Sequence, residues 1–132
     1  MKVILNKCFG GFDVSEEAYE LYAKKKGINI FRYELAPDLN YRKTKRSGIC
    51  IYHFTQDFGD KINHNDVDWD KYFSLDTEHR EDPILIEVVE ELGKKASGAL
   101  GELEVVDIPD GMDYVIDEYD GIETLHENVQ VW

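Results

Sequence analysis

The chain opens on a continuous apolar run and then changes to a helical pattern. Residues 2–8 contain Val, Ile and Leu in succession, which is typical of a buried β-strand. The pattern that follows predicts a helix ending near Lys26, with Asp13 as its N-cap and Glu16 completing a capping box. Residues 28–34 predict a second strand. A strand, a helix and a strand in this order favour a right-handed βαβ unit.

The strongest helical periodicity lies in the second half of the chain. Apolar residues recur at helical spacing from Leu85 to Ala96, so one face of this segment is apolar. Asp82 supplies an N-cap, and Pro83 occupies the first helical position, where a missing amide proton costs no hydrogen bond. Gly93 weakens the last turns, and Gly98 is expected to end the helix. A second, amphipathic helix is therefore predicted here.

Three further strands are predicted towards the C-terminus, at residues 102–108, 113–119 and 122–127. Asp120 and Gly121 join the last two, and this pair is preferred in the type I′ turn of a hairpin. The chain is therefore expected to end in a β-hairpin.

The middle of the chain, residues 35–81, has a less regular pattern. Residues 48–54 predict a strand, and residues 69–75 fit either a short helix or an ordered loop. Aromatic residues throughout this segment indicate that it packs against the rest of the protein. Together the patterns predict a single α/β domain over residues 1–132, with a mixed β-sheet, the N-terminal βαβ unit, the second amphipathic helix and the C-terminal β-hairpin.

The composition is that of a globular protein. Of the 132 residues, 42% are hydrophobic and 33% are charged, which disfavours a disordered chain. No apolar run approaches the ~20 residues that span a bilayer, and the N-terminal run is too short for a signal peptide. Cys8 and Cys50 match no disulfide or zinc pattern, so free thiols in a reducing compartment are expected. We expect a cytoplasmic protein that does not bind a membrane.

The formal net charge of −13 is distributed unevenly. Residues 102–132 contain ten acidic side chains and no Lys or Arg, whereas residues 41–46 contain four basic ones. An acidic surface repels nucleic acid, so we expect no direct nucleic-acid binding. The acidic face fits solubility alone, mimicry of a nucleic acid, or contact with a basic protein. A homo-oligomer would cover the open edges of a small sheet.

Two segments carry residue types that bind a small anionic ligand. Gly10 and Gly11 separate the first strand from the first helix, where the backbone can approach a ligand and a helix N-terminus attracts an anion; a tight structural turn is the alternative. Residues 41–46 combine an aromatic ring, a hydroxyl and cations, which grip a phosphate and stack on a base, or else form a plain basic loop. The candidate ligand-binding residues are Asn6, Gly10, Gly11, Phe12, Tyr41, Arg42, Lys45, Arg46, Tyr119, Asp120, Glu123, His126 and Trp132.

Neither a catalytic nor a metal site is predicted. Glu123 and His126 have groups suited to acid–base chemistry, but in a strand they point to opposite faces. Residues 66–70 begin like an EF-hand loop, but Lys71 and Thr77 stand where such a loop requires Gly and Glu. No histidine has a partner at metal-ligand spacing, and no cofactor motif is present. We therefore expect no metal and no cofactor.

Motifs at both ends of the chain and in the second helix occur together in one known family. They are residues 2–12 with Ser15–Ala18, residues 80–83 with 88–93, residues 105–110 and 118–121, Glu123 and the final Trp132. In these segments the chain resembles an uncharacterised family of small proteins encoded by tailed bacteriophages and prophages. That family usually carries a His-Arg pair shortly before the last Trp. Here residues 128–131 read Asn-Val-Gln-Val instead, so a role of that pair does not carry over.

The resemblance implies a phage protein in the host cytoplasm, but the family brings no established activity. Small accessory phage proteins without catalytic motifs commonly act by binding. The resemblance thus implies a protein that counteracts host defence by sequestering a nucleotide-like signalling molecule. Two alternatives stay open. One is an acidic inhibitor that binds a host protein through residues 102–132, including by mimicry of nucleic acid. The other is a small nucleotide-processing enzyme that uses Cys8, Glu123 or His126.

Overall fold

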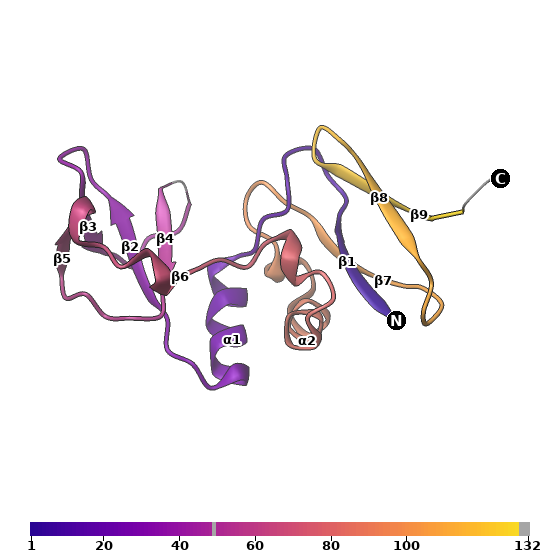
Figure 1. The fold of residues 1–132 in the computed structure, drawn as a ribbon, viewed down its shortest axis with the longest axis horizontal. Coiled ribbons are helices and arrows are strands. Elements are labelled where there is room, and N and C mark those ends of the chain that lie inside the picture. Colours follow the sequence, from indigo (N-terminus) through magenta and orange to yellow (C-terminus); the bar gives the residue numbers. More distant parts are fainter. Residues whose placement is uncertain (49, 130–132) are drawn as a thin grey trace.

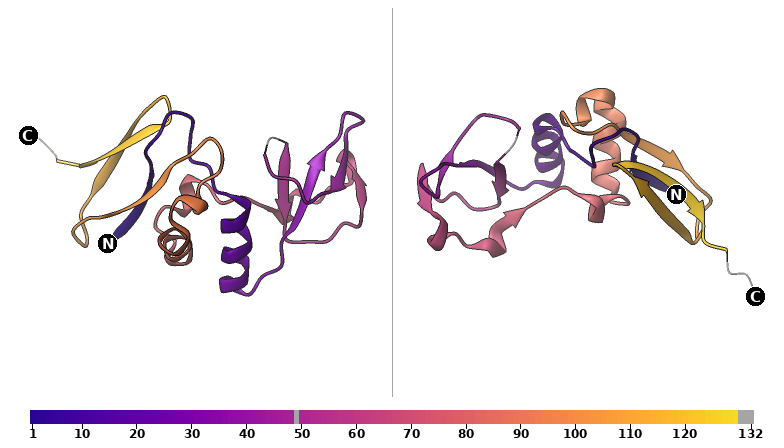
Figure 2. Two further views of the ribbon diagram at one scale, coloured as in Figure 1. Left: turned by 180° about the vertical axis from the view of Figure 1, so that it is seen from behind. Right: turned by 90° about the horizontal axis from the view of Figure 1, so that it is seen from above.

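The computed structural model describes residues 1–48 and 50–129 (Figure 1). The strands and α-helices are β1 (Lys2–Asn6), α1 (Glu16–Lys26), β2 (Phe31–Leu35), β3 (Asn40–Lys43), β4 (Ile51–Phe54), β5 (Lys61–Asn63), β6 (Tyr72–Phe73), α2 (Pro83–Leu92), β7 (Leu103–Asp107), β8 (Tyr114–Tyr119) and β9 (Ile122–Glu127). Short 3₁₀ helices occur at His64–Asp66, Trp69–Lys71, Thr77–His79 and Gly93–Ala96. Both α-helices lie between the five-stranded sheet β5-β3-β2-β4-β6 on one side and strands β1, β7, β8 and β9 on the other (Figures 1 and 2).

Strand β1 is buried, as its apolar run predicts. It pairs antiparallel with β7, and the register places Lys2 opposite Asp107 and Asn6 opposite Leu103. Ile4 is fully buried in a core cluster that also contains side chains of α1, α2 and β7. Removing these apolar surfaces from water supplies the main driving force for this half of the fold. A second, separate cluster lies within the five-stranded sheet.

The α/β class, the second amphipathic helix and the C-terminal hairpin are confirmed, but the N-terminal topology differs from the expectation. Strand, helix and strand do follow one another, yet β1 and β2 enter different sheets and form no βαβ crossover. The strand pairs of the described residues are antiparallel, so no mixed sheet forms among them. The physical reason lies in β2, where Arg32 and Glu34 alternate with apolar residues. Such alternation is typical of an antiparallel strand, whereas parallel strands are apolar on both faces.

Helix α1 begins two residues later than expected. Ser15, not Asp13, is its N-cap, and the Ser15 hydroxyl accepts a hydrogen bond from the Ala18 amide at 3.1 Å. The Asp13 carboxylate instead accepts from the Leu100 amide at 3.0 Å. Asp13 therefore ties the segment before α1 to a distant turn. The helix ends at Lys26 as predicted, and Gly27 after it adopts the left-handed conformation.

Helix α2 begins as predicted and ends early. Asp82 accepts hydrogen bonds from the Ile84 and Leu85 amides, and Pro83 is the first helical residue. The helix stops at Leu92, because Gly93 has a positive φ of 59° and leads into a 3₁₀ helix. The described part of the chain has no helix that is both apolar enough and long enough to cross a membrane.

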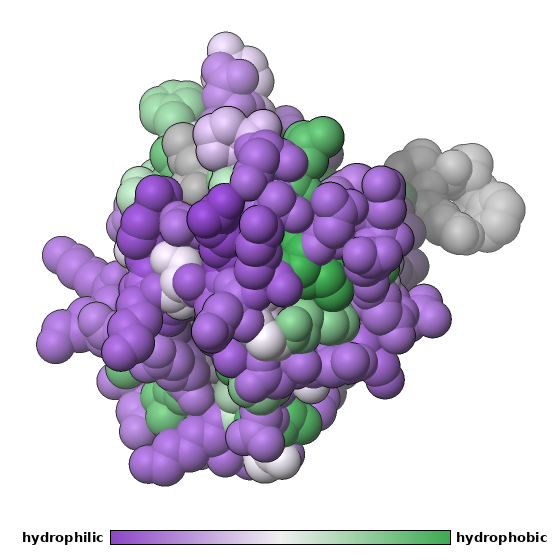
Figure 3. Space-filling model, turned by 90° about the vertical axis from the view of Figure 1, so that its left-hand side faces the viewer, coloured by the Kyte–Doolittle hydropathy of each residue, from purple (hydrophilic) through white to green (hydrophobic). Residues whose placement is uncertain are grey.

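The middle segment forms the five-stranded sheet. Phe31 and Tyr33 lie on the face that packs against Phe58 and Val67, in the second core cluster. The intervening residues of β2 and β4 point to the opposite face, which looks towards α1. Residues 69–71 form a 3₁₀ helix that leads into β6. Viewed from this end of the molecule, the surface is mostly hydrophilic (Figure 3).

The C-terminal hairpin has the predicted turn. Asp120 and Gly121 have φ values of 49° and 92°, as a type I′ turn requires, and they connect β8 to β9. The hairpin lies over β1 in Figures 1 and 2. Its residues belong to neither core cluster, so polar contacts to β1 hold it in place.

Candidate functional site

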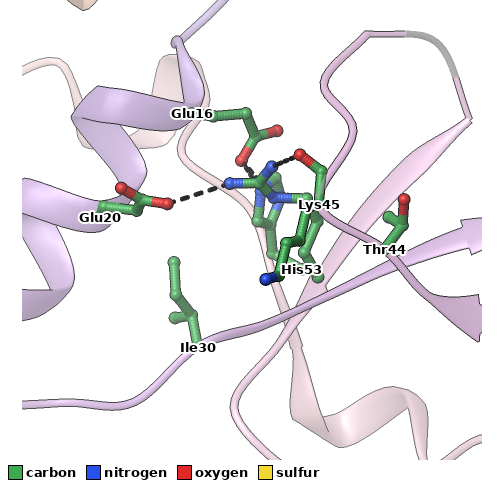
Figure 4. A pocket seen from close by; sticks show the side chains of 7 residues that line it. Glu16, Glu20, Ile30, Thr44, Lys45 and His53 are labelled. Carbon is green, nitrogen blue, oxygen red and sulfur yellow. Dashed lines mark hydrogen bonds and ion pairs between the residues drawn. The ribbon is translucent and has the colours of Figure 1, made fainter. Parts of the chain in front are cut away.

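A cluster of charged and aromatic side chains lies between α1 and the five-stranded sheet. Arg32 of β2 and His53 of β4 are directly opposite each other in the strand register, so their side chains share one face. Glu16, in the first turn of α1, reaches both of them. Figure 4 shows Glu16, Glu20 and His53 converging from the helix and the sheet.

One carboxylate oxygen connects the cluster. Oε2 of Glu16 lies 2.7 Å from His53 Nε2 and 3.0 Å from Arg32 Nε. Arg32 also bonds Glu20 at 3.2 Å and donates to the carbonyls of Lys45 and Arg46 at 2.7 and 2.9 Å. The guanidinium therefore compensates the charge of Glu16 and fastens both α1 and residues 45–46 to the sheet.

The His53 ring is fixed by stacking as well as by its carboxylate. Its centroid lies 3.8 Å from that of Tyr19, and the two rings are within 7° of parallel. The Tyr19 hydroxyl accepts a hydrogen bond from the Leu75 amide at 3.0 Å. Burial raises the pKa of Tyr19 to about 12, so this ring stays neutral at physiological pH. The result is a preorganised wall with little freedom to rearrange.

Two cavities adjoin this wall, and both are lined by Glu16 and His53. The smaller has a volume of about 340 Å³ and is also lined by Glu20, Ile30, Arg32, Thr44 and Lys45 (Figure 4). The larger has a volume of about 570 Å³ and is also lined by Asp13, Val14, Ser15, Glu17, Tyr19, Ser47, Gly48, Ile51, Tyr72, Ser97, Gly98, Ala99 and Leu100. We call the two cavities together the α1 groove.

The two parts of the α1 groove differ in character. In the smaller part Lys45 faces a helix that carries Glu16 and Glu20, so both signs of charge are present. The larger part combines hydroxyl groups with apolar and aromatic side chains, and the ring of Tyr72 at its edge is 45% exposed. A groove of this size and mixture suits a small organic ligand with polar substituents.

The predicted basic segment does not form one cationic patch. Tyr41 is 2% exposed and packs in the second core cluster. Arg42, Lys43 and Arg46 pair with Asp38, Asp57 and Glu34 respectively. Lys45 alone among these four cations lines the α1 groove. Alternation along β3, which ends at Lys43, and the loop that follows it separate the side chains that the sequence places together.

Four of the predicted ligand-binding residues do converge, but their polar groups bond one another. The backbone amide of Asn6 donates to Glu123 Oε1 at 2.7 Å, and the side-chain Nδ2 of Asn6 donates to the Gly121 carbonyl at 2.6 Å. The Gly10 amide donates to the Asp120 carbonyl at 3.0 Å. This arrangement matches the structural-turn interpretation of the glycine segment.

The other predicted residues near the termini have separate surroundings. Gly11 bonds the Leu100 carbonyl, and the Phe12 ring lies 5.3 Å from the Arg80 guanidinium. Tyr119 is 73% exposed. His126 is exposed and contacts Asp117 at 3.2 Å, on the opposite face from the buried Glu123, as the strand alternation predicts. Trp132 lies outside the described residues.

Sequence reasoning missed Glu16, Arg32 and His53 as a group, and it also missed Arg80. Arg80 forms a bidentate pair with Glu123 and donates to the Ile4 carbonyl at 2.9 Å. The available signal for Arg32 and His53 was the presence of a polar residue within an otherwise apolar strand, whereas Glu16, in the first turn of a helix, gave no such signal. Such residues need a partner from another element, but the pattern does not say which one.

Among residues 1–48 and 50–129, no group of three His, Cys, Asp or Glu side chains is placed to hold a metal ion. Cys8 and Cys50 are free thiols. Comparison of the chain with protein-family models, with curated proteins and with solved structures finds no match. The geometry of the α1 groove is therefore the basis for a functional proposal.

Proposed function

We propose that the protein acts by binding, and that it holds a nucleotide-like small molecule in the α1 groove. The observation that carries this proposal is the shared wall of Glu16 and His53, which joins a hydroxyl-rich aromatic cavity to one that contains a lysine. An elongated ligand with a ring at one end and an anionic group at the other has this same division. The volumes of about 570 and 340 Å³ lie in the range of small-molecule sites.

The larger cavity suits the base and sugar of such a ligand. The half-exposed ring of Tyr72 offers a stacking surface for a base. Ser47 can donate or accept hydrogen bonds, and the exposed carboxylate of Glu17 can accept them from sugar hydroxyls. Because Arg32 compensates Glu16, the central wall presents little net negative charge to the ligand.

The smaller cavity suits the anionic end. Lys45 supplies a cation, and the Thr44 hydroxyl supplies a further hydrogen-bond donor. Glu20 bonds Arg32 and so is partly neutralised. A ligand with a single phosphate group fits this balance better than one with a dense row of charges, because the carboxylates of α1 remain close by.

In the phage setting that the sequence resemblance implies, binding of this kind would withdraw a host signalling nucleotide and so counteract defence. A protein with this role needs affinity and release on a slow timescale, and it needs no chemical step. A fixed wall of stacked and hydrogen-bonded side chains favours affinity, because few groups have to be ordered when the ligand binds.

The test is titration calorimetry with a panel of cyclic nucleotides and ADP-ribose-type nucleotides. Tyr72→Ser is expected to weaken binding about 5- to 150-fold, because base–aromatic stacking is worth about 1–3 kcal/mol. Lys45→Ala is expected to weaken binding of phosphate-bearing ligands specifically. Lys24→Ala removes an exposed lysine of α1 that does not line the groove, and it should leave the affinity unchanged.

Circular dichroism of each variant separates loss of binding from loss of folding. An absence of binding heat for every member of the panel would contradict the proposal. So would a ligand whose affinity is reduced equally by Lys24→Ala and by Lys45→Ala.

A further inference from the structure

Three turns from distant parts of the chain meet in the structure. They are residues 8–12 after β1, residues 98–101 before β7, and residues 119–121 between β8 and β9. The Gly10 amide donates to the Asp120 carbonyl at 3.0 Å, and the Gly11 amide donates to the Leu100 carbonyl at 3.1 Å. Figure 1 shows the loop after β1 running beneath the hairpin turn. We call this arrangement the three-turn platform.

The backbones of the platform approach one another more closely than side chains would permit. A Cβ atom on Gly10 would lie 2.1 Å from the Leu100 carbonyl oxygen. A Cβ atom on Gly121 would lie 2.7 Å from backbone atoms of Gly10, and one on Gly101 would lie 2.8 Å from the Gly11 carbonyl oxygen. Glycine is required at each of these contacts. The platform is consequently a rigid unit in which three turns are locked together.

This rigid unit exposes large apolar side chains. Phe9, Leu100 and Tyr119 are 66, 62 and 73% exposed. They account for three of the eight exposed large hydrophobic residues found in the described part of the chain, although the three turns are short. These side chains contribute little to the cores in their exposed positions, so stability of the fold does not explain them. Exposed aromatic side chains on a preorganised backbone are typical of a protein-binding site.

The surroundings of the platform are acidic. The turns and their flanking residues, 6–13, 98–104 and 117–123, contain one cation, Lys7. The same segments contain seven carboxylates: Asp13, Glu102, Glu104, Asp117, Glu118, Asp120 and Glu123. Arg80 neutralises Glu123, and the other six give these segments an excess of negative charge, which we call the acidic rim. A partner of the same sign would be repelled, including nucleic acid and a second copy of this chain with its net charge of −13.

We propose that the three-turn platform docks a partner protein whose surface carries Lys or Arg around an apolar side chain. The apolar contact would supply the binding energy, and the opposite charges would select the partner and speed its association. The platform shares Gly98, Ala99 and Leu100 with the larger cavity of the α1 groove, but Phe9 and Tyr119 line neither cavity. Docking through Phe9 and Tyr119 therefore does not depend on whether the groove binds a nucleotide.

A selection from a random displayed-peptide library tests the chemistry of the partner directly. We expect the enriched peptides to combine Lys or Arg with Leu, Phe or Trp, and to bind less tightly as salt is raised. Phe9→Ser and Tyr119→Ser should each lower the affinity for an enriched peptide about tenfold or more. Leu39→Ser is the matched control, because Leu39 is 61% exposed on a turn of the five-stranded sheet, and it should have no effect.

A charge variant tests the rim without changing the apolar side chains. Asp120→Asn keeps a residue that tolerates the positive φ of this turn, and Glu102→Gln keeps the shape of the side chain. The double variant should weaken the binding of the enriched peptides and reduce the salt dependence of that binding. The proposal is overturned by a library with no enrichment, by peptides that bind Phe9→Ser and Leu39→Ser equally, or by self-association that buries the platform.

Discussion

Replacing Glu123 by alanine should loosen the C-terminal hairpin from β1. Glu123 is 5% exposed, and its Oε1 accepts hydrogen bonds from the Asn6 amide at 2.7 Å and from Arg80 Nη1 at 2.8 Å. Its Oε2 accepts a further bond from Arg80 Nη2. The alanine variant leaves the Asn6 amide without this acceptor and leaves the guanidinium, whose side chain is 13% exposed, without its carboxylate.

The size of the effect follows from what remains around Arg80. Removing one partner of a buried ion pair costs about 3–5 kcal/mol, since the other charge stays buried. Arg80 keeps its hydrogen bond to the Ile4 carbonyl and its position over the Phe12 ring. We therefore expect the lower end of that range, a loss of about 3 kcal/mol in the free energy of unfolding.

Urea denaturation measures this loss, and hydrogen exchange shows where it acts. Protection should fall first at residues 114–127, because the hairpin belongs to neither core cluster. Glu127→Ala is the matched control on the same strand. Glu127 is exposed, so its removal should change stability by no more than about 0.5 kcal/mol.

Unfolding of Glu123→Ala and Glu127→Ala at the same urea concentration would contradict this prediction. Unchanged exchange at residues 114–127 in Glu123→Ala would contradict it as well. A double replacement, Glu123→Leu with Arg80→Met, removes both charges together. It should recover much of the lost stability, because no uncompensated charge is left behind.

The ion pair of Glu123 and Arg80 also makes the stability of the fold depend on pH. Burial alone would raise the pKa of Glu123, but hydrogen bonds from Arg80 and the Asn6 amide outweigh it and hold the pKa below its ordinary value of 4.5. A lowered pKa in the folded state stabilises the protein above the unfolded value, and that contribution is lost as the pH falls through the folded value. The wild-type protein should therefore lose stability below about pH 4.5, and Glu123→Gln should lose less over the same interval.

Two further replacements test local features of the backbone. Gly10→Ala should lower the free energy of unfolding by more than about 2 kcal/mol, because φ is +131° and the new Cβ would meet the Leu100 carbonyl oxygen. The Cβ of Gly11→Ala meets no atom within 4 Å, so this variant should stay within about 1 kcal/mol of wild type. Calorimetric melting of the two variants makes the comparison, and equal melting temperatures would contradict it. Asp82→Ala should cost about 1–2 kcal/mol, because it removes the N-cap of α2 and the 2.5 Å hydrogen bond from Tyr22. Urea denaturation should show this loss, and an unchanged midpoint would contradict the capping role.

The parts of the fold that could be predicted are those with a strong local signal. The apolar run of residues 2–8 identifies β1, Asp82 and Pro83 locate the start of α2, and Asp120-Gly121 defines the hairpin turn. The partner of β1 has no such signal, because β7 lies about a hundred residues away and antiparallel pairing depends on the assembled core. The N-cap of α1 has no decisive local signal either, since Asp13 and Ser15 are both good caps and the tertiary contact of Asp13 with Leu100 decides between them.

The candidate site could be predicted only in part. The glycine turn and the hairpin turn were both singled out, and the structure brings them together, although their polar groups bond each other. Glu16, Arg32 and His53 come from a helix and two strands, so no spacing in the sequence links them. The sequence presents Lys45 as one of four cations in residues 41–46, and the position of each side chain on its strand or loop separates Lys45 from the rest.

The pairing of β1 with β7 also has a consequence during synthesis. A ribosome adds about 5–20 residues per second, so β1 waits roughly 5–20 s before the strand opposite it has been made. The five-stranded sheet, which pairs strands within residues 31–73, is complete in sequence well before that time. Val3, Ile4 and Leu5 stay without their strand partner in the meantime, and they form an apolar segment that a chaperone can recognise. Translation arrested before β7 would therefore release a chain with a folded sheet and an unprotected first strand.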